Sequence, residues 1–331
     1  YFPNIAYALL TDPRMGAGDA IGASSVDRRS MEISAKWCEA NGFYWDGVVA
    51  SSENLREFIF ENAGYILCDF TVIGGKFGLK PSLPYNTDYS LNRSAQPEIK
   101  ALFTDGVVRK TEVSFLSPEE RQPFQAVCLY REETKNGFAE TRSIRIRFAD
   151  ETEEIPVEEF DMTSFCTNVA HARLFARVAL MLRRKVDHSI KFETTPQAAM
   201  SLNPGEYFKF ASKVTHTERF ASGVIDQAGN VISSEGIQGS ISIVYWQPGT
   251  TAVRDAQLRV DSNMITNQSG LYGCLWSKVS DTENTRIYKC ESLSYAEDGL
   301  VEVAASYAPL TSRGALAILD WNSNTFVEEN S

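Results

Sequence analysis

The chain has 331 residues, of which 43% are hydrophobic and 23% charged, so wholesale disorder is excluded and two or three packed domains are expected. Its net charge of −11 argues against a general affinity for nucleic acid, which needs a basic face to neutralise phosphates. No apolar run approaches the roughly 18 residues of a membrane-spanning helix, and no signal peptide is recognisable. The chain starts at Tyr1 without a methionine, and we expect it to be part of a longer protein.

The first notable segment is LLTDPRMGAGDAIG, residues 9–22, which has an Asp-Pro turn and three glycines. A dinucleotide-binding fingerprint needs glycines at relative positions one, three and six, but Ile21 takes the sixth place. A Walker loop is also absent, since Gly75-Lys76 is followed by Phe77 instead of Ser or Thr. Asp19 would repel a phosphate. We therefore predict a turn whose glycines serve the backbone alone, namely Gly16, Gly18 and Gly22.

A helix is predicted next. Ser24 or Ser25 can cap it, it runs to about Asn41, and Gly42 ends it. Its expected apolar face consists of Met31, Ile33, Ala35, Trp37 and Cys38.

A second helix and a hairpin follow. The helix is expected after Ser51 and Ser52, because apolar residues recur at helical spacing at Leu55, Phe58, Ile59 and Ala63. The stretch 65–81 is predicted to be two strands joined by Gly74-Gly75, since paired glycines supply the positive φ values of a two-residue turn.

β signals dominate from Ile99 onward. Residues 126–148 predict a long hairpin that turns at Asn136-Gly137. In its return strand, apolar residues alternate with Arg145 and Arg147, so one face should be buried, formed by Ile144, Ile146 and Phe148. The acidic stretch 151–161, broken by Pro156, is the expected exit from this first region.

The strongest helix signal covers Asn168 to Lys185. One apolar stripe is expected from Ala172, Phe175, Ala179 and Leu182, widened by Leu174, Val178 and Met181. The three cations at its end, Arg183, Arg184 and Lys185, suit the negative end of the helix dipole.

Short strands follow a turn at 203–206, and their spacing favours a barrel or sandwich over βαβ units. The predicted fold class is α+β. Residues 1–155 are expected to form a mixed helix, hairpin and β region, and residues 156–331 a packed helix followed by a β-barrel-like domain.

Candidate chemistry is sparse. The six cysteines lack a Cys-x-x-Cys pair and the chain has three histidines, so zinc has little support. Disulfides stay possible, although Cys68, Cys128 and Cys166 lie in apolar runs typical of buried thiols. His171 could act as a general base, but no G-x-S-x-G nucleophile elbow accompanies it, and His171, His188 and His216 are predicted to be structural. We predict no catalytic residue, cofactor or metal.

Acidic and aromatic residues leave one alternative open. The adjacent acids Glu132-Glu133, Glu153-Glu154 and Glu158-Glu159 lie in polar runs, whereas a glycosidase needs two carboxylates across a cleft. A carbohydrate-binding or carbohydrate-active surface module could instead stack sugars on exposed aromatics, for which the candidates are Tyr245, Trp246, Trp276 and Trp321. The same four residues equally suit strand cores.

The segment NIAYALLTDPRMGAG resembles the tail-tip proteins of long-tailed phages, the family of the phage lambda tip attachment protein J, also called host specificity protein. In that family a similar segment is followed by a helix ending in Trp/Tyr-Cys, here Trp37-Cys38, and by a helix and hairpin, here 54–81. Met15 stands where the family commonly has an aromatic residue.

The second half is also similar to that family. A helix rich in alanine is followed by VDHSIKFETTP and by LNPGEYFKF, in which Glu206 replaces the usual aspartate of a turn leading into a barrel. RFASGVID and YKCESLSYAEDGLVEVAASY continue the pattern. The resemblance covers most of the chain, every motif is short, and the family has no catalytic residues to carry over.

The resemblance implies a structural role in the virion. It implies a homotrimeric hub that closes the distal end of the tail tube, with other tail-tip, distal tail and tail tube proteins as partners. A host receptor would be bound by parts outside this chain, and neither specific nucleic-acid binding nor a membrane span is expected. The glycines of 9–22 would then turn the backbone at a domain junction.

Overall fold

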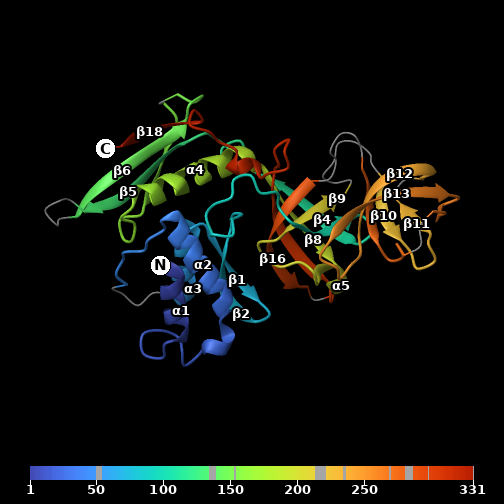
Figure 1. Cartoon of the computed structure of the whole chain (residues 1–331), viewed down its shortest axis with the longest axis horizontal. Coiled ribbons are helices and arrows are strands. Elements are labelled where there is room, and N and C mark those ends of the chain that lie inside the picture. Colours follow the sequence, from blue (N-terminus) through green and yellow to red (C-terminus); the bar gives the residue numbers. More distant parts are fainter. Residues whose placement is uncertain are drawn as a thin grey trace. The chain divides into compact units, whose positions relative to one another are not determined.

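The computed structural model describes residues 1–49, 54–133, 139–152, 154–212, 221–233, 236–267, 270–279, 286–296 and 298–330. The chain forms two compact units, shown in Figure 1. Unit 1 contains Tyr1–Gln96, Pro118–Lys185 and Thr311–Ser331, and unit 2 contains Pro97–Ser117 and Val186–Leu310. Neither unit is one continuous stretch, and the expected division between residues 155 and 156 falls inside unit 1.

Unit 1 begins with two helices, α1 (Phe2–Thr11) and α2 (Arg28–Asn41). Helix α1 was not predicted. The cap of α2 is Asp27, whose side chain accepts a hydrogen bond from the Ser30 N–H, so the expected Ser24 or Ser25 cap is wrong. Those serines lie in a short 3-10 helix, η1 (Ala23–Ser25). Gly42, with a φ of 71°, ends α2 as predicted.

The next helix is α3 (Leu55–Tyr65), which buries Ile59 and Ala63. Asn54 caps it, and the serines expected before it, Ser51 and Ser52, lie outside the described residues. The predicted hairpin is confirmed: β1 (Cys68–Ile73) pairs antiparallel with β2 (Lys76–Pro81). Gly74 and Gly75 form the turn with φ values of 58° and 75°.

An aromatic core holds these elements together. Trp37 is fully buried, and its indole N–H donates to the Ile66 carbonyl at 3.0 Å. Phe2 and Phe43 are also fully buried, and the Trp37 and Phe43 ring centroids lie 5.9 Å apart. The Trp-Cys pair of the motif therefore packs in the interior.

A four-stranded sheet forms the rest of unit 1, in the order β18 (Phe326–Asn330), β6 (Ala139–Phe148), β5 (Gln125–Glu133) and β7 (Val157–Asp161). Helix α4 (Val169–Lys185) packs on β5 and β6 (Figure 1). The predicted burial of Ile144, Ile146 and Phe148 is confirmed. The hairpin turn predicted at Asn136-Gly137 lies outside the described residues, and β18 was not predicted.

The predicted stripe of α4 is partly wrong, because Leu182 is 42% exposed. The helix contacts the sheet on one side and the 3-10 helix η2 (Ala317–Leu319) on another. Its buried face is therefore wider than the predicted stripe and lies on a different side of the helix. The buried residues are His171, Ala172, Ala176, Val178, Leu180 and Met181.

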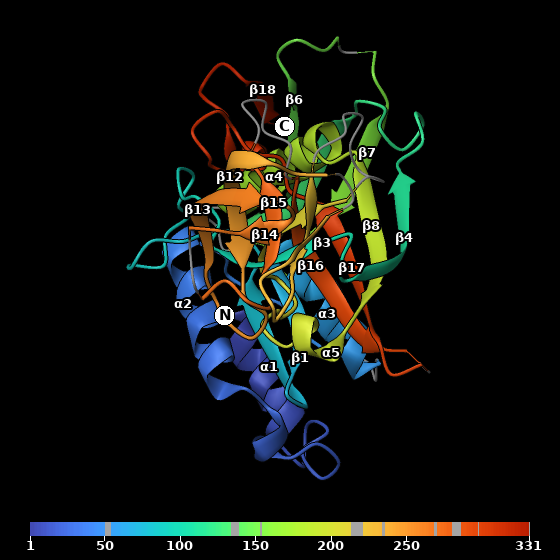
Figure 2. The ribbon, with the colours of Figure 1, turned by 90° about the vertical axis from the view of Figure 1, so that its right-hand side faces the viewer.

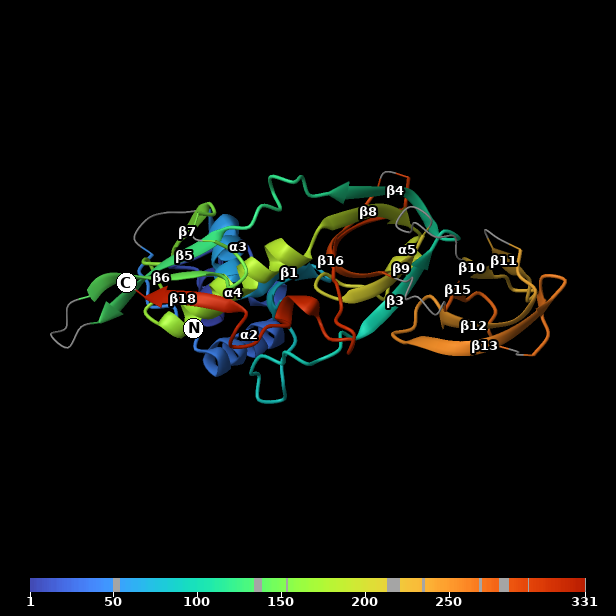
Figure 3. The same cartoon turned by 90° about the horizontal axis from the view of Figure 1, so that it is seen from above.

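Unit 2 contains two six-stranded sheets. The order of the first is β3 (Ile99–Thr104), β9 (Tyr207–Ala211), β16 (Arg286–Tyr295), β17 (Val301–Tyr307), β8 (His188–Thr194) and β4 (Val108–Phe115). Its pairs are antiparallel except for β3 with β9, and its strong curvature is visible in Figure 3. The predicted turn before β9 is present, with Gly205 at a φ of 81°.

The order of the second sheet is β11 (Val231–Ser233), β10 (Ser222–Ile225), β15 (Leu275–Lys278), β12 (Gly239–Trp246), β13 (Val253–Asp261) and β14 (Met264–Ile265). Its two ends approach each other, since Asn230 pairs with Met264, and it is a nearly closed barrel. One short helix, α5 (Pro196–Ala199), follows β8.

The two sheets of unit 2 share a core. Phe103 of the first sheet and Trp246 of the second are fully buried, with ring centroids 6.0 Å apart. A separate cluster around Ile243, Leu258 and Trp276 fills the barrel. The predicted α+β class, with barrel-like sheets and one packed helix, is confirmed.

Candidate functional site

The loop that follows α1 is the first candidate, since its glycines raised the question of phosphate binding. Gly16 and Gly18 lie against the end of the helix. A Cβ added at Gly16 would lie 1.9 Å from the Leu9 carbonyl oxygen, and one at Gly18 would lie 2.3 Å from the Thr11 oxygen. Both positions therefore require glycine for close backbone approach.

The backbone N–H groups of the loop are already hydrogen-bonded to acceptors of the same segment. The Asp12 carboxylate accepts from the N–H groups of Arg14 at 2.7 Å and Met15 at 3.0 Å. The Asp12 carbonyl accepts from Gly16 and Gly18, and the Leu9 carbonyl accepts from Ala17. A phosphate would thus meet a carboxylate where it needs free donors.

The prediction that these glycines serve the backbone is confirmed by this geometry. The loop lies within unit 1, so the expectation that it marks a domain junction is wrong.

His171, the predicted structural histidine of α4, is fully buried beside Phe43, with ring centroids 4.6 Å apart. Its Nε2 lies 2.8 Å from the Tyr65 carbonyl oxygen, to which a neutral imidazole donates. Burial lowers the pKa of His171 to about 4, so the ring is neutral at pH 7. The neutral ring packs between Phe43 and Tyr65, the last residue of α3. His216 lies outside the described residues.

His188 belongs to a buried polar network in unit 2. Its Nδ1 lies 2.6 Å from the Asp187 carboxylate and its Nε2 lies 2.8 Å from the Tyr288 hydroxyl. The Arg286 guanidinium approaches Nε2 at 3.3 Å. Burial lowers the pKa of His188 and raises that of Tyr288. Because both rings are buried among aromatic neighbours, the network joins β8 to β16 and offers no exposed nucleophile.

All six cysteines are free and buried. Burial raises the pKa of Cys38 and Cys128 to about 12 and that of Cys166 to about 11, so these thiols stay protonated and unreactive. In the described part of the chain, no group of three or more His, Cys, Asp or Glu side chains is placed to hold a metal ion.

Among the described residues, the adjacent glutamates singled out in the sequence do not face one another across a cleft. Glu132 pairs with Arg142 at 3.2 Å, and Glu158 pairs with Arg183 at 2.9 Å. Glu153 and the side chain of Glu133 lie outside the described part.

The sugar-stacking alternative loses its candidate aromatics. Trp246 and Trp276 are fully buried, Trp321 is 7% exposed, and Tyr245 packs against the barrel core. A polar hollow of about 580 Å³ lies in unit 2, lined by Gln238, Gly239, Arg259, Val260, Asp261, Thr266 and Asn267. None of these lining residues is aromatic, so the platform that sugars prefer is missing there.

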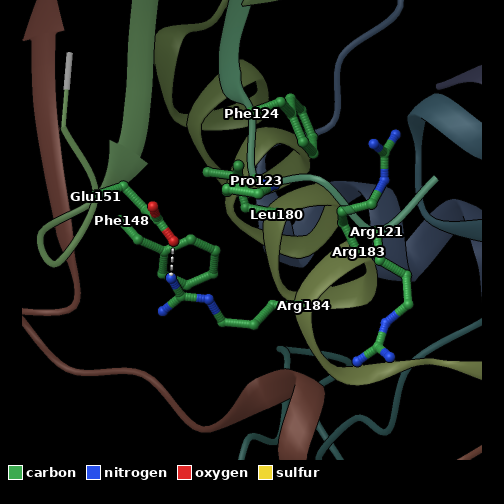
Figure 4. Close-up of a pocket in the computed structure, with 8 residues that line it drawn as sticks. All are labelled: Arg121, Pro123, Phe124, Phe148, Glu151, Leu180, Arg183 and Arg184. Atoms are coloured by element: carbon green, nitrogen blue, oxygen red, sulfur yellow. Dashed lines mark hydrogen bonds and ion pairs between the residues drawn. The ribbon is translucent and has the colours of Figure 1, made fainter. Parts of the chain in front are cut away.

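A pocket of about 190 Å³ in unit 1 combines apolar and cationic side chains (Figure 4). Its lining residues are Arg121, Pro123, Phe124, Phe148, Glu151, Leu180, Arg183 and Arg184. The Arg184 guanidinium lies 3.5 Å from the Phe148 ring centroid and 2.7 Å from the Glu151 carboxylate. The Arg183 guanidinium lies 4.7 Å from the Phe124 ring centroid.

The side chains of this pocket attach α4 to the neighbouring segments, and their arrangement does not favour binding of a ligand. Arg183 and Arg184 are each held by a carboxylate and an aromatic face. Figure 4 shows the three guanidinium groups pointing apart instead of towards one centre. From sequence alone Arg183 and Arg184 were assigned to the helix dipole. Their partners could not be predicted, because they lie up to 59 residues away, at Phe124.

Among the described residues, no helix has both the length and the apolarity to cross a membrane. No protein-family model matches the chain, and no curated protein does.

Solved structures that match include the virion of a native gene transfer agent particle, at 11% identity and a TM-score of 0.39, over 83% of this chain and 46% of that one. A tail protein from Neisseria meningitidis MC58 matches at 9% identity and a TM-score of 0.33, over 88% and 67%. The 43 kDa tail protein of prophage MuSo2 from Shewanella oneidensis matches at 8% identity and a TM-score of 0.31, over 83% and 64%. The chain thus spans between 46% and 67% of the length of these three chains.

Proposed function

We propose that this chain is a structural component of a bacteriophage tail tip, a central hub or tip attachment protein. In that role it closes the distal end of the tail tube and supports host attachment and DNA ejection. It works in the virion, as a homotrimer, in contact with other tail-tip, distal tail and tail tube proteins.

The observation that supports this proposal most is that the residues of the family-like motifs serve the fold. Gly16 and Gly18 allow the backbone to fold onto α1, and Trp37 and Cys38 are fully buried. The Gly205 turn leads directly into β9 of a curved sheet. Residues used in this way suit a protein that acts through shape and surfaces.

The site geometry also favours a non-enzymatic role. His171 is buried and neutral, and His188 is buried and hydrogen-bonded to Asp187. The six thiols are buried, and Arg183 and Arg184 of the unit 1 pocket form ion pairs with carboxylates. A stable trimer would bury more than roughly 2,000 Å² in total at its interfaces, and the host receptor would bind to parts outside this chain.

Deleting the gene from the phage genome tests the proposal. Electron microscopy of the lysate should show capsids without complete tails, and expression of the chain within its full protein should restore infectious particles. Light scattering on tips released from purified particles should give three copies of the protein. Normal tails in the deletion lysate would refute the proposed role.

A further inference from the structure

His188, the first residue of β8, is a titratable side chain that the proposed function does not use. Its ring is fully enclosed, yet both of its nitrogens lie within hydrogen-bonding distance of polar groups. It sits where β4, β8, β17 and β16 run as neighbours in the first sheet of unit 2 (Figure 2).

The neighbours of the ring come from all of these strands. The side chains that face it are Phe115 of β4, Asp187 just before β8, Arg286 and Tyr288 of β16, and Tyr307 of β17. Among the described residues, the charged groups that act on the ring are therefore one carboxylate and one guanidinium. The other titratable groups against it are the two phenols.

The hydrogen-bonding partners determine the tautomer of the neutral ring. The Asp187 carboxylate, 2.6 Å from Nδ1, can only accept, so Nδ1 carries the proton. Nε2 is then an acceptor, and it faces two donors, the Tyr288 hydroxyl at 2.8 Å and the Arg286 guanidinium at 3.3 Å. The lone pair of Nε2 thus helps to hold the arginine in place.

A proton on Nε2 would remove this lone pair. The Tyr288 hydroxyl can turn and accept from the new N–H, because a phenol is both a donor and an acceptor. The Arg286 guanidinium has donors only, and it lies 3.3 Å from the nitrogen that gains the proton. Since Asp187 pairs with the imidazolium at Nδ1, Arg286 is the neighbour that has to move.

We propose that His188 is a proton-operated latch for Arg286, which the neutral ring holds and the protonated ring releases. Arg286 is the first residue of β16 and pairs with Phe210 of β9, so its release would loosen this end of the strand pair. The inference does not depend on the proposed function.

The latch is closed at neutral pH and opens in acid. Burial lowers the pKa of His188 below the usual histidine value, and the positive charge of Arg286 lowers it further. Asp187 opposes this shift, because its carboxylate favours the charged ring. Release of Arg286 therefore begins below the pH range in which an exposed histidine titrates.

Nitrogen-15 NMR of the histidine rings as a function of pH tests the latch. The chain has three histidines, and the His188 signals are assigned by their loss in His188→Gln. In the neutral ring the proton should be on Nδ1. Arg286→Gln should raise the pKa of His188 by about 1, because it removes a neighbouring like charge.

Arg259→Gln is the matched control for this measurement. It removes the same charge from an exposed position of β13 in the same unit, and it should leave the pKa of His188 unchanged. If His188→Gln does not fold, His171→Gln and His216→Gln assign the His188 signals by elimination.

Hydrogen exchange of the amides at the start of β16 measures the release itself. Comparison of the wild type with His188→Gln at the same pH cancels the intrinsic pH dependence of exchange. Relative to this variant, the protection of residues 286–289 in the wild type should fall roughly threefold between pH 7.5 and 5.0. The amides of β12 should show no such difference.

Three results would overturn the inference. The first is a neutral ring with its proton on Nε2. The second is a His188 pKa that Arg286→Gln leaves unchanged, or that Arg259→Gln raises equally, since an equal rise would reflect net charge alone. The third is unchanged protection of residues 286–289 at a pH where NMR shows His188 to be protonated.

Discussion

At the scale of single residues, polar groups are placed to support packing. His171 illustrates this, because its imidazole takes the place of an apolar side chain between Phe43 and the end of α3. Such a ring must stay neutral to remain buried, since a buried charge without a partner is costly. The buried histidine therefore makes the protein sensitive to acid.

We predict that His171 lowers stability as the pH falls. Its pKa is about 4 in the folded state and about 6.5 when unfolded, so the unfolded state binds the proton first. Its contribution is fully present above pH 6.5 and is lost progressively towards pH 4. Between pH 7.5 and 5.0 the free energy of unfolding should fall by about 2 kcal/mol on this account.

Urea unfolding of the wild type and of His171→Gln at both pH values measures this effect. The variant should show a pH-dependent loss about 2 kcal/mol smaller. Some dependence should stay, because the pKa of His188 is lowered too. Equal pH dependence in both proteins would show that His171 does not titrate in this way.

At the scale of elements, side-chain pairs attach the last strand of the chain to α4. The Glu328 carboxylate of β18 lies 2.8 Å from Arg173 Nε and 2.8 Å from Arg177 Nε. Glu328 is 23% exposed, so solvent screens these pairs only partly. The carboxylate thus links the strand to two turns of the helix.

We predict that Glu328→Gln destabilises the protein by about 1–2 kcal/mol, since it leaves two half-buried guanidinium groups without their carboxylate. Glu329→Gln, one residue further along and exposed, is the control and should change stability by less than about 0.5 kcal/mol. Chemical denaturation followed by circular dichroism gives both values. Equal effects at the two positions would mean that the pairs contribute nothing.

Local signals account for what could be predicted at this scale. Gly42 at the end of α2 and Gly74-Gly75 in the hairpin each specify a backbone conformation on their own. Strand β18 has no such signal, because its partner β6 lies about 180 residues earlier in the sequence. Leu182 was misplaced because the second contact of α4, with η2, comes from a segment about 135 residues later in the sequence.

The candidate sites follow the same rule. The spacing of the glycines in residues 9–22 was enough to predict that this loop does not bind phosphate. The hydrogen bonds and close backbone contacts of the loop agree with that prediction. The unit 1 pocket was not predictable, since it brings together Arg121, Phe148 and Arg184 from three segments. The burial of Trp246 and Trp276 was equally undetermined, because aromatic residues suit both strand cores and sugar platforms.

At the scale of the whole molecule, all six thiols are enclosed. Cys38, Cys68, Cys128 and Cys166 lie in unit 1, and Cys274 and Cys290 lie in unit 2. Exposure and thiolate character both govern reactivity, and burial removes both. Reaction with a thiol reagent therefore reports on the integrity of both units together.

We predict that the native protein at pH 7.5 releases no chromophore promptly with Ellman's reagent, and that six thiols react per chain in guanidinium chloride. Absorbance at the reagent's usual wavelength measures this, and a free-cysteine standard of known concentration serves as the assay control. A prompt reaction of one or more thiols in the native protein would contradict the burial described here.

The interleaved order of the two units has a consequence for synthesis on the ribosome. Unit 2 needs residues only up to Leu310, whereas the sheet of unit 1 lacks β18 until residues 326–330 have been made. The guanidinium groups that Glu328 will contact must therefore stay unpaired while about 150 further residues are translated, and the edge of β6 must stay uncovered for some 180. At about 5–20 residues per second, that interval lasts roughly 10–35 s, during which a chaperone could shield the open edge.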